Sequence, residues 1–212
     1  MLWIPKENDF STEIVKNKSE YIDIFSSEWK KEIIINNDVD FNYLVISDSP
    51  DIFISINTNW DKTTSKIFWI FYSSSSPTKA KVEFNLNNDN SKTEIYLLSI
   101  TKENQHISVD WSINMARWVK KASGILLEDN LVFWDNVSIK TKPILNIYSN
   151  DVQASHWARI EKVDAEKMFY LSSKWISLSV AEKLILDWYI DYVLNHFVSI
   201  DQTFLKSKIT QT

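Results

Sequence analysis

The sequence is unusually poor in glycine, cysteine and arginine. Its 212 residues contain one glycine, Gly124, and no cysteine, whereas a typical soluble chain of this length has roughly 15 glycines. The absence of cysteine excludes disulfides, thiolate metal ligands and cysteine nucleophiles within the chain. Arg117 and Arg159 are the only arginines, and the net charge of −5 gives no electrostatic reason to expect nucleic-acid binding.

The sequence also lacks a long apolar run. The most apolar stretch, residues 67–72, is far shorter than the ~20 residues that a membrane-spanning helix needs. The opening residues MLWIPKEND turn acidic too soon for a secretory signal peptide. We therefore expect a cytoplasmic protein, and a content of 44% hydrophobic and 24% charged residues is that of a globular chain with a sizeable core.

Short β-prone runs separated by polar turns fill most of the chain. Residues 41–47 and 51–57 alternate apolar and polar side chains, which is typical of half-buried strands. Such spacing suits a sandwich, a barrel or a β-helix, and periodicity alone does not choose among them. The runs are residues 32–35, 41–47, 51–57, 66–72, 81–86, 93–100, 106–109, 125–127, 131–133, 137–140 and 144–148.

The pattern changes after Ile160 and predicts helices. Asp164 is placed to cap a first helix that ends near Ser173, with Val163 and Met168 as a hydrophobic staple. Residues before 31 give no such clear pattern. We expect an irregular or partly helical lead-in over 1–30, a β core over 31–160, and a C-terminal helical domain and tail over 161–212.

A second helix is predicted to start at Ser179, which forms a capping-box pattern with Glu182. The polar tail after Phe197 is expected to fray. The apolar face of this helix is predicted to hold Ala181, Leu184, Ile185, Trp188 and Tyr192.

Few residues suggest catalysis. The histidines His106, His156 and His196 are too scattered for a metal-binding pattern, and the chain lacks the glycine-rich phosphate loops and the HExxH motif. Ser155 precedes His156, but triad partners meet in space rather than in sequence. A carbohydrate-active or glycan-binding β-solenoid, with tryptophans as stacking platforms, remains an alternative.

The C-terminal third resembles the SufB/SufD family of iron–sulfur cluster assembly proteins. The similar segments are KPILNIYSNDVQASHWARIEKVDAEKMFYLSSKWIS and AEKLILDWYIDYVLNHF, within residues 142–197. The positions that match the family pattern in order are Pro143, Leu145, Ile147, Asp151, Val152, Ser155, His156, Ala158, Asp164, Phe169, Tyr170, Leu171, Lys174, Ile176 and Ala181.

The resemblance implies a right-handed parallel β-helix core followed by a C-terminal helical pair. It further implies a SufD-like scaffold without catalysis of its own, which docks a SufC-type ABC ATPase through its C-terminal helices. A SufB-like subunit or a second copy of the chain is the implied partner. The resemblance implies no stably bound cofactor and at most a transient iron–sulfur cluster at a partner interface.

The resemblance also assigns site residues. His156 matches a family histidine near the interface between two β-helix subunits, so His156, Asp151 and Arg159 form the expected cluster-assembly interface. His156 is the single metal-ligand candidate, and its alternative role is to hydrogen-bond a neighbouring carbonyl. Ala154 stands where many SufD-type members have cysteine. The expected ATPase-docking residues are Phe169, Tyr170, Leu171, Lys174 and Trp175, with core packing as the alternative for Phe169 and Leu171.

Ten tryptophans accompany the single glycine. Trp157, Trp175 and Trp188 stand where the family has glycine, and Trp60 and Trp111 follow Asn and Asp, where glycine would give the strongest hairpin signals. We hypothesise that most of these positions are glycine in the cell, encoded by UGA codons that some bacterial lineages read as glycine. The alternative is that the tryptophans are genuine and packed. Recoding would remove them as support for sugar binding.

Overall fold

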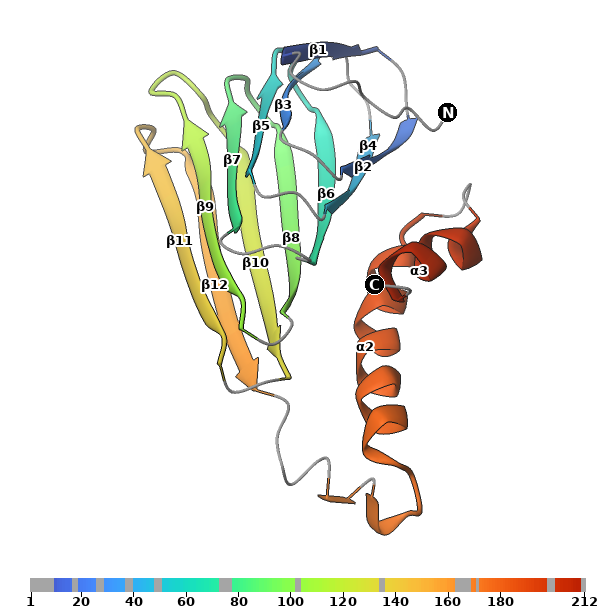
Figure 1. Ribbon diagram of the computed structural model, residues 1–212. Coiled ribbons are helices and arrows are strands. Elements are labelled where there is room, and N and C mark those ends of the chain that lie inside the picture. Colours follow the sequence, from blue (N-terminus) through green and yellow to red (C-terminus); the bar gives the residue numbers. More distant parts are fainter. Residues whose placement is uncertain are drawn as a thin grey trace.

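The computed structural model describes twelve strands followed by helices (Figure 1). The residues it describes are 10–16, 19–25, 29–36, 40–47, 51–72, 78–101, 104–133, 136–162, 169–170, 172–197 and 201–210. The strands are β1 (Phe10–Val15), β2 (Ser19–Phe25), β3 (Trp29–Ile35), β4 (Asp40–Ser47), β5 (Asp51–Thr58), β6 (Thr64–Tyr72), β7 (Thr78–Leu86), β8 (Lys92–Thr101), β9 (His106–Met115), β10 (Ala122–Val132), β11 (Ser138–Ile147) and β12 (Val152–Lys162). Two helices follow, α2 (Leu178–Leu194) and α3 (Gln202–Thr210).

Successive strands alternate between two parallel sheets. The order β1-β3-β5-β7-β9-β11 forms one sheet of six strands, here called the odd sheet, and β12-β10-β8-β6-β4-β2 forms the even sheet. Each coil of the chain therefore adds one strand to each sheet, which is the arrangement of a β-solenoid. The prediction of a mainly β protein with a parallel β-helix core and C-terminal helices is confirmed.

The coils lengthen along the chain. Phe10 pairs with Lys30, 20 residues later (30 minus 10), whereas His106 pairs with Ser138, 32 residues later (138 minus 106). A repeat whose length changes from coil to coil leaves no fixed period in the sequence. This explains why the sequence predicts a series of strands but shows no repeat of fixed length.

Residues along each strand face alternately inward and outward, and the inward-facing residues fill the interior between the two sheets. In β5, for example, Ile52, Ile54 and Ile56 are buried while the residues between them are partly exposed. Trp69 and Trp111 meet edge to face at 5.8 Å in this core, and the Trp69 indole N–H donates to Ser47 Oγ at 2.6 Å. Burial of each such large side chain contributes about 1.5–3 kcal/mol.

The N-terminal residues are part of the solenoid, and the expected irregular or partly helical lead-in over 1–30 is wrong there. β1 and β2 pair in parallel with β3 and β4. The charged residues of this region made its strands hard to recognise in the sequence, because one of these residues lies inside the solenoid. Asp23 is buried, and its Oδ2 lies 2.5 Å from both Lys31 Nζ and Tyr43 OH.

The single glycine occupies a point of close approach. A Cβ atom at Gly124 would lie 2.9 Å from Met115 Cε and 3.0 Å from Ile113 Cγ2, inside the core. Real Cβ atoms do not approach other atoms so closely, so a larger residue would force these side chains of β9 to move. Close packing, rather than backbone conformation, therefore favours glycine at this position.

The corners of the solenoid use other residues where a left-handed backbone is needed. Lys62, Asn90 and Lys121 have φ values of 63°, 59° and 54°. They occupy the same corner of successive coils, each two residues before Thr64, Lys92 and Ser123, which pair in register. A long side chain at such a φ is strained, yet none of these three left-handed positions is a tryptophan.

This geometry corrects part of the glycine hypothesis. Trp111 was expected at a turn, but it lies within β9 and is buried, and no positive φ is found at Trp60. The strands are parallel, so the hairpin chemistry behind both expectations does not apply. Trp134 lies outside the described residues. Trp175 alone among the described tryptophans has a positive φ, 64°, and its side chain is 99% exposed.

A ladder of asparagines runs across the outer face of the odd sheet. Asn85 Nδ2 donates to Asn57 Oδ1 at 2.8 Å, Asn114 Nδ2 to Asn85 Oδ1 at 2.7 Å, and Asn146 Nδ2 to Asn114 Oδ1 at 2.7 Å. At the start of the ladder, Asn57 Nδ2 donates to Glu32 Oε1 at 3.1 Å. The four asparagines are in register on neighbouring strands, so each amide satisfies the next, as in other stacked parallel sheets.

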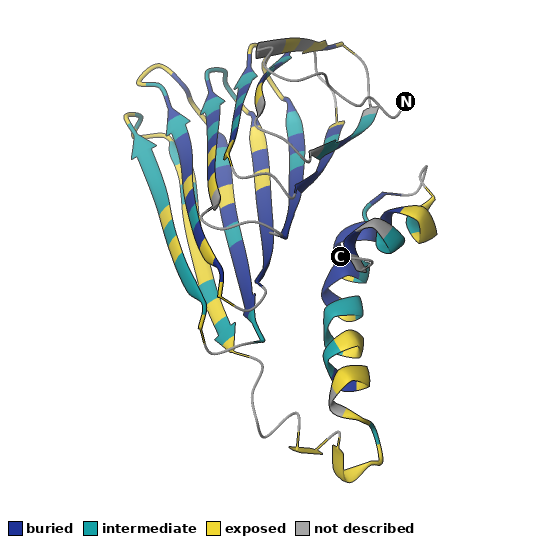
Figure 2. Ribbon diagram, in the orientation of Figure 1, coloured by how far each residue is buried: buried dark blue, intermediate teal, exposed yellow. Residues whose placement is uncertain are grey.

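The helices cover the outer face of the even sheet. Figure 2 shows the buried residues of α2 concentrated in its C-terminal half, and Ile190, Val193 and Leu194 pack there with Leu44 and Ile70 of the sheet. α3 adds the buried residues Leu205 and Ile209, so the expectation of a fraying tail after Phe197 is wrong. No helix among the described residues is long and apolar enough to cross a membrane.

Two further details of α2 differ from expectation. The helix begins at Leu178 with Ser177 as its N-cap and no side-chain capping bond, so Ser179 lies inside the first turn and the capping box is wrong. The buried face was also misplaced. Ala181 is buried as predicted and Ile185 is partly buried, but the exposed residues Leu184, Trp188 and Tyr192 were assigned to the same face. The expected cap and staple of the first helix, residues 163–168, lie outside the described residues.

The backbone at Trp175 makes the recoding hypothesis testable at one position. We expect glycine, not tryptophan, at residue 175 of the protein isolated from its own cells, because an exposed left-handed residue after a helix is usually glycine. Peptide mass spectrometry of the native protein measures this directly. Trp69, which is buried and hydrogen-bonded, is the matched position and is expected to remain tryptophan. Detection of tryptophan at both 157 and 175 would refute the hypothesis.

Candidate functional site

The last coil leaves two strand edges open. β11 ends the odd sheet and β12 ends the even sheet, so each has one hydrogen-bonded neighbour in the described part of the chain. Partly and fully exposed residues dominate both strands, in contrast to the buried strands of the preceding coils (Figure 2). Ile160 of β12 is 57% exposed at this end. Open edges of this kind are templates for pairing with another chain.

The three residues predicted to form the cluster-assembly interface do not converge. His156 and Arg159 are three residues apart on β12, and successive side chains of a strand point to opposite faces. His156 is exposed and lies on the same side as Ala154, which packs against the interior core. Arg159 points the other way, towards α2. Asp151 is exposed before β12, about 16 Å along the strand from His156.

In the described part of the chain, His156 belongs to no group of side chains that could hold a metal ion. Among the described residues, no three His, Cys, Asp or Glu side chains are grouped so that they could hold a metal ion. The His156 ring also makes no hydrogen bond to another described residue, so the alternative role of bonding a neighbouring carbonyl finds no support there. What the structure does give His156 is a position at the open end of the solenoid.

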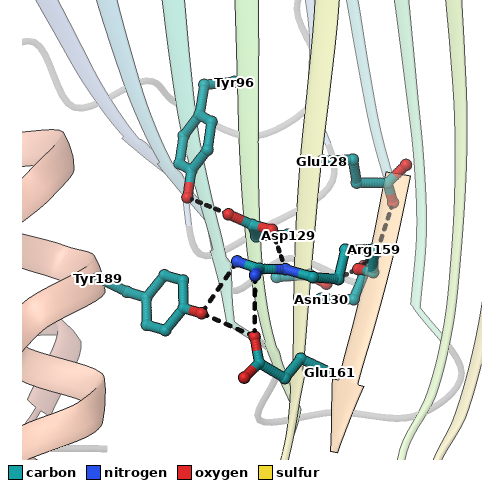
Figure 3. Close-up of polar contacts among 8 residues, drawn as sticks. Tyr96, Glu128, Asp129, Asn130, Arg159, Glu161 and Tyr189 are labelled. Atoms are coloured by element: carbon teal, nitrogen blue, oxygen red, sulfur yellow. Dashed lines mark hydrogen bonds and ion pairs between the residues drawn. The ribbon is translucent and has the colours of Figure 1, made fainter. Parts of the chain in front are cut away.

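Arg159 is the centre of a cluster that joins three strands to α2 (Figure 3). Arg159 Nε donates to Asp129 Oδ1 of β10 at 2.9 Å, and its terminal nitrogens lie 3.0 Å from Tyr189 OH of α2 and 3.3 Å from Glu161 Oε2. Tyr189 OH in turn donates to Glu161 Oε2 at 2.9 Å. Tyr96 OH of β8 donates to Asp129 Oδ2 at 2.8 Å. We call these five residues the Arg159 cluster.

The electrostatics of the cluster keep both hydroxyls protonated. Burial and the hydrogen bond to Glu161 raise the pKa of Tyr189 to about 12. Burial and the neighbouring Asp129 carboxylate also raise the pKa of Tyr96 above its ordinary value. Burial acts to lower the pKa of Arg159, but the hydrogen bond and charge of Asp129 outweigh it and the net direction is upward. The hydroxyls therefore donate, and the guanidinium stays charged, across the physiological pH range.

A second polar group lies inside the last coils. Glu128 is fully buried in β10 and accepts hydrogen bonds from Thr141 Oγ1 of β11 and from Asn130 Nδ2, the latter at 3.0 Å. Asn130 also accepts from Ser99 Oγ, and its Nδ2 donates to the backbone carbonyl of Arg159 at 3.1 Å. This interior network therefore attaches the backbone of β12 to the core at the residue whose side chain centres the Arg159 cluster.

The predicted ATPase-docking residues are exposed where the structure describes them. Phe169 and Tyr170 are exposed in a helical segment before α2, and Trp175 is almost wholly exposed. The Lys174 Nζ atom lies 5.6 Å from the centre of the Tyr170 ring, in a cation–π contact. Leu171 lies outside the described residues. Core packing, the alternative for Phe169, is therefore wrong.

An exposed apolar stripe on α2 extends this surface. Its members recur every four residues, which places them on one helix face, and each is at least partly open to solvent. They are Val180, Leu184, Trp188 and Tyr192. We call the stripe together with Phe169, Tyr170, Lys174 and Trp175 the helix surface.

Sequence reasoning missed the buried carboxylates Glu128 and Asp129 and the bridging Tyr189. Glu128, Asp129 and Asn130 were passed over as a polar break between two short strands. The sequence did contain one indication of this group. Three consecutive polar residues lie between Leu127 and Leu131, which is unusual if the residues on both sides belong to a strand of the core. Their partners, Thr141 and Arg159, lie 13 and 30 residues away, so no local pattern could reveal the pairing.

Comparison with known proteins gives a match over this part of the chain. Residues 112–187 match the family model described as "SUF system FeS cluster assembly, SufBD core domain". This segment contains the end of β9 (residues 112–115), the whole of β10–β12, and α2 as far as Asp187. The match begins 30 residues before the segment that carries the resemblance in the sequence (142 minus 112).

Individual relatives agree with the family match. The chain is 36% identical over 74 residues to the iron–sulfur cluster assembly protein SufD of Escherichia coli, which is 35% of this chain and 18% of that protein. It is 35% identical over 69 residues to an iron–sulfur cluster assembly SufBD family protein of Synechocystis, 32% of this chain and 15% of that one. A SufBD family protein of Staphylococcus saprophyticus is 26% identical over 102 residues, 48% of this chain and 22% of the relative. The chain thus spans only about a fifth of the length of these relatives.

Burial of Glu128 predicts a specific pH dependence of stability. Burial raises its pKa above 4.5 against the opposing hydrogen bonds from Thr141 and Asn130. A carboxyl group with a raised pKa binds its proton more tightly in the folded state, so its stabilising contribution is present below the unfolded pKa and is lost as the pH rises through the folded pKa. A tenfold difference in proton affinity between the folded and unfolded states corresponds to about 1.4 kcal/mol.

We therefore expect Glu128→Gln to change the slope of stability with pH. The free energy of unfolding of the variant, relative to the original chain, should rise between pH 4 and pH 8, as measured by urea unfolding at each pH. The exposed Glu94, which pairs with Lys66 at 3.0 Å, provides the control Glu94→Gln. Parallel stability curves for Glu128→Gln and the original chain would contradict the prediction.

Proposed function

We propose that the chain is a SufD-like scaffold of the Suf system, because its residues 112–187 match the family model of the SufBD core domain. In this proposal it acts in the cytoplasm, docks a SufC-type ABC ATPase through its C-terminal helices, and catalyses no reaction itself. The observation that carries the proposal is the family segment itself, which ends in a helix whose apolar residues are only partly covered by the solenoid.

The helix surface has the chemistry of a docking site. Four apolar side chains on one face of α2 and three aromatic residues before it are exposed, and clusters of large apolar groups on a soluble protein mark interaction sites. Aromatic residues also dominate the energetics of protein interfaces. The opposite face of α2 is already covered by the even sheet, so this surface is available for another protein.

The open end of the solenoid supports a second contact. β11 and β12 each offer an unpaired edge among the described residues, and His156 and Ile160 are exposed beside it. We propose that a SufB-like subunit or a second copy of the chain covers this end. His156 would then lie at the interface, as the family resemblance implies.

A cluster in this proposal is cargo rather than a resident cofactor. The chain has no cysteine, and Ala154, which lies two residues before His156, cannot ligate iron. Thiolates are the usual ligands of iron–sulfur clusters. A transient cluster at this interface would therefore depend on thiolates of the partner, with His156 or carboxylates as the ligands that this chain could add.

The docking proposal predicts a loss of binding when the helix surface is made polar. We expect the intact chain to bind the SufC-type ATPase of the same organism, and Leu184→Ser and Phe169→Ser each to weaken the Kd about tenfold or more, because they remove apolar contacts at the centre of the interface. Isothermal titration calorimetry measures the Kd.

Ile14→Ser is the matched control. Ile14 and Leu184 are each 50% exposed, but Ile14 lies on β1 at the far end of the solenoid. Ile14→Ser should therefore bind as the intact chain does. Failure of the intact chain to bind the ATPase, or an equal loss in all three variants, would contradict docking through the helix surface.

The pairing proposal predicts that a charge at the open end prevents association. Sedimentation of the chain, alone and mixed with a SufB-like subunit, should reveal a dimer in one of the two cases. Ile160→Glu should abolish that dimer, because it places an unpaired charge where β12 meets its partner. Ile14→Glu, at the opposite end, should leave the dimer intact. If the chain sediments as a monomer both alone and in the presence of the SufB-like subunit, the proposal is refuted.

A further inference from the structure

The Arg159 cluster fixes α2 to the open strand edge. Apolar packing holds α2 on the even sheet, but it is non-directional and leaves a helix free to slide. Directional contacts come from Arg159 and Glu161 of β12, which both bond the Tyr189 hydroxyl of α2. The end strand and the helix thus share one set of hydrogen bonds.

Each polar group of the cluster is satisfied by another member. Arg159 uses its Nε and both terminal nitrogens on three different partners. The carboxylates of Asp129 and Glu161 receive the remaining donors, which are the Tyr96 and Tyr189 hydroxyls. Because hydrogen bonds to charged groups are short and directional, a displacement of Tyr189 weakens its contacts with Arg159 and Glu161 together.

β12 has fewer strand neighbours than the central strands of the even sheet. It is bonded to β10 alone among the described strands, whereas the strands in the middle of the even sheet lie between two neighbours. A side chain of the interior also holds its backbone, because Asn130 Nδ2 donates to the Arg159 carbonyl. The side chain and the carbonyl of Arg159 thus connect α2, β12 and the interior network at one residue.

We propose that the Arg159 cluster is a mechanical coupling between the helix surface and the open end of the solenoid. Displacement of α2 moves Arg159 and Glu161, and with them the strand that carries His156 and Ile160. The contacts within this chain support the coupling itself. Its regulatory use would be that docking at the helices alters the partner interface at β12, and this use rests on the function proposed above.

Hydrogen exchange on the intact chain tests the coupling without any partner. Tyr189→Phe keeps the ring but removes the hydroxyl that bridges Arg159 and Glu161. We expect amide exchange to become about tenfold faster or more in residues 157–161 of β12 as well as in α2, the size of effect that loss of a charged hydrogen bond produces. Exchange in the central strand β6 should not change.

Two further variants separate coupling from general destabilisation. Tyr148→Phe removes the hydroxyl of a tyrosine that is 65% exposed and belongs neither to the cluster nor to the helix surface, and it should leave exchange unchanged. Glu161→Gln, on β12, should accelerate exchange in α2. Faster exchange in α2 alone, or equal acceleration in β6, would overturn the coupling.

The regulatory use is tested separately by adding the SufC-type ATPase. Binding should change exchange in residues 157–161 of the intact chain, and this change should be lost in Tyr189→Phe although the ATPase still binds. Absence of binding to the intact chain would refute the docking proposal while leaving the coupling result intact. Binding without any change in β12 would refute the regulatory use alone.

Discussion

In-register stacking of successive coils is the constraint on which the rest of the structure depends. Most strand residues of a coil pair in register with a residue of the coil before it, so side chains that satisfy one another are repeated along the axis. Asn57, Asn85 and Asn114 form a ladder for this reason. The same constraint leaves the last coil incomplete, because stacking satisfies a strand only when another follows it. The open edges of β11 and β12 are a direct consequence.

An element of the fold can be predicted from the sequence when the pattern that marks it depends only on the residues of that element. β5 was predictable because its alternation of buried and exposed residues depends on the strand alone. β2 was not, because Asp23 is buried only in the presence of Lys31 and Tyr43. The face of α2 was misassigned for a related reason. The helix has apolar residues on more than one side, and only the position of the even sheet decides which of them are covered.

The candidate site divides in the same way. The family resemblance located the open end and the helices, since an ordered motif survives in the sequence. It could not tell that His156 and Arg159 face opposite sides, which required β12 to be recognised as a continuous strand through both. Nor could it reveal the corners, where Lys62, Asn90 and Lys121 adopt the left-handed backbone that glycine usually takes. The scarcity of glycine is thus met by other residues at the corners, and Gly124 is kept where space demands it.

The position of the charged residues argues that the Arg159 cluster specifies geometry more than it adds stability. Removing Asp129 and Arg159 from water costs free energy that their attraction offsets only in part, and well-packed apolar residues can do as well or better. Apolar residues were available, since Leu98 and Leu131 pack with α2 on the same face. A directional contact outweighs this cost only where the relative position of two elements matters. Here the two elements are the helix that carries the exposed stripe and the strand that forms the open edge, which are the surfaces through which a scaffold of this family would meet its partners.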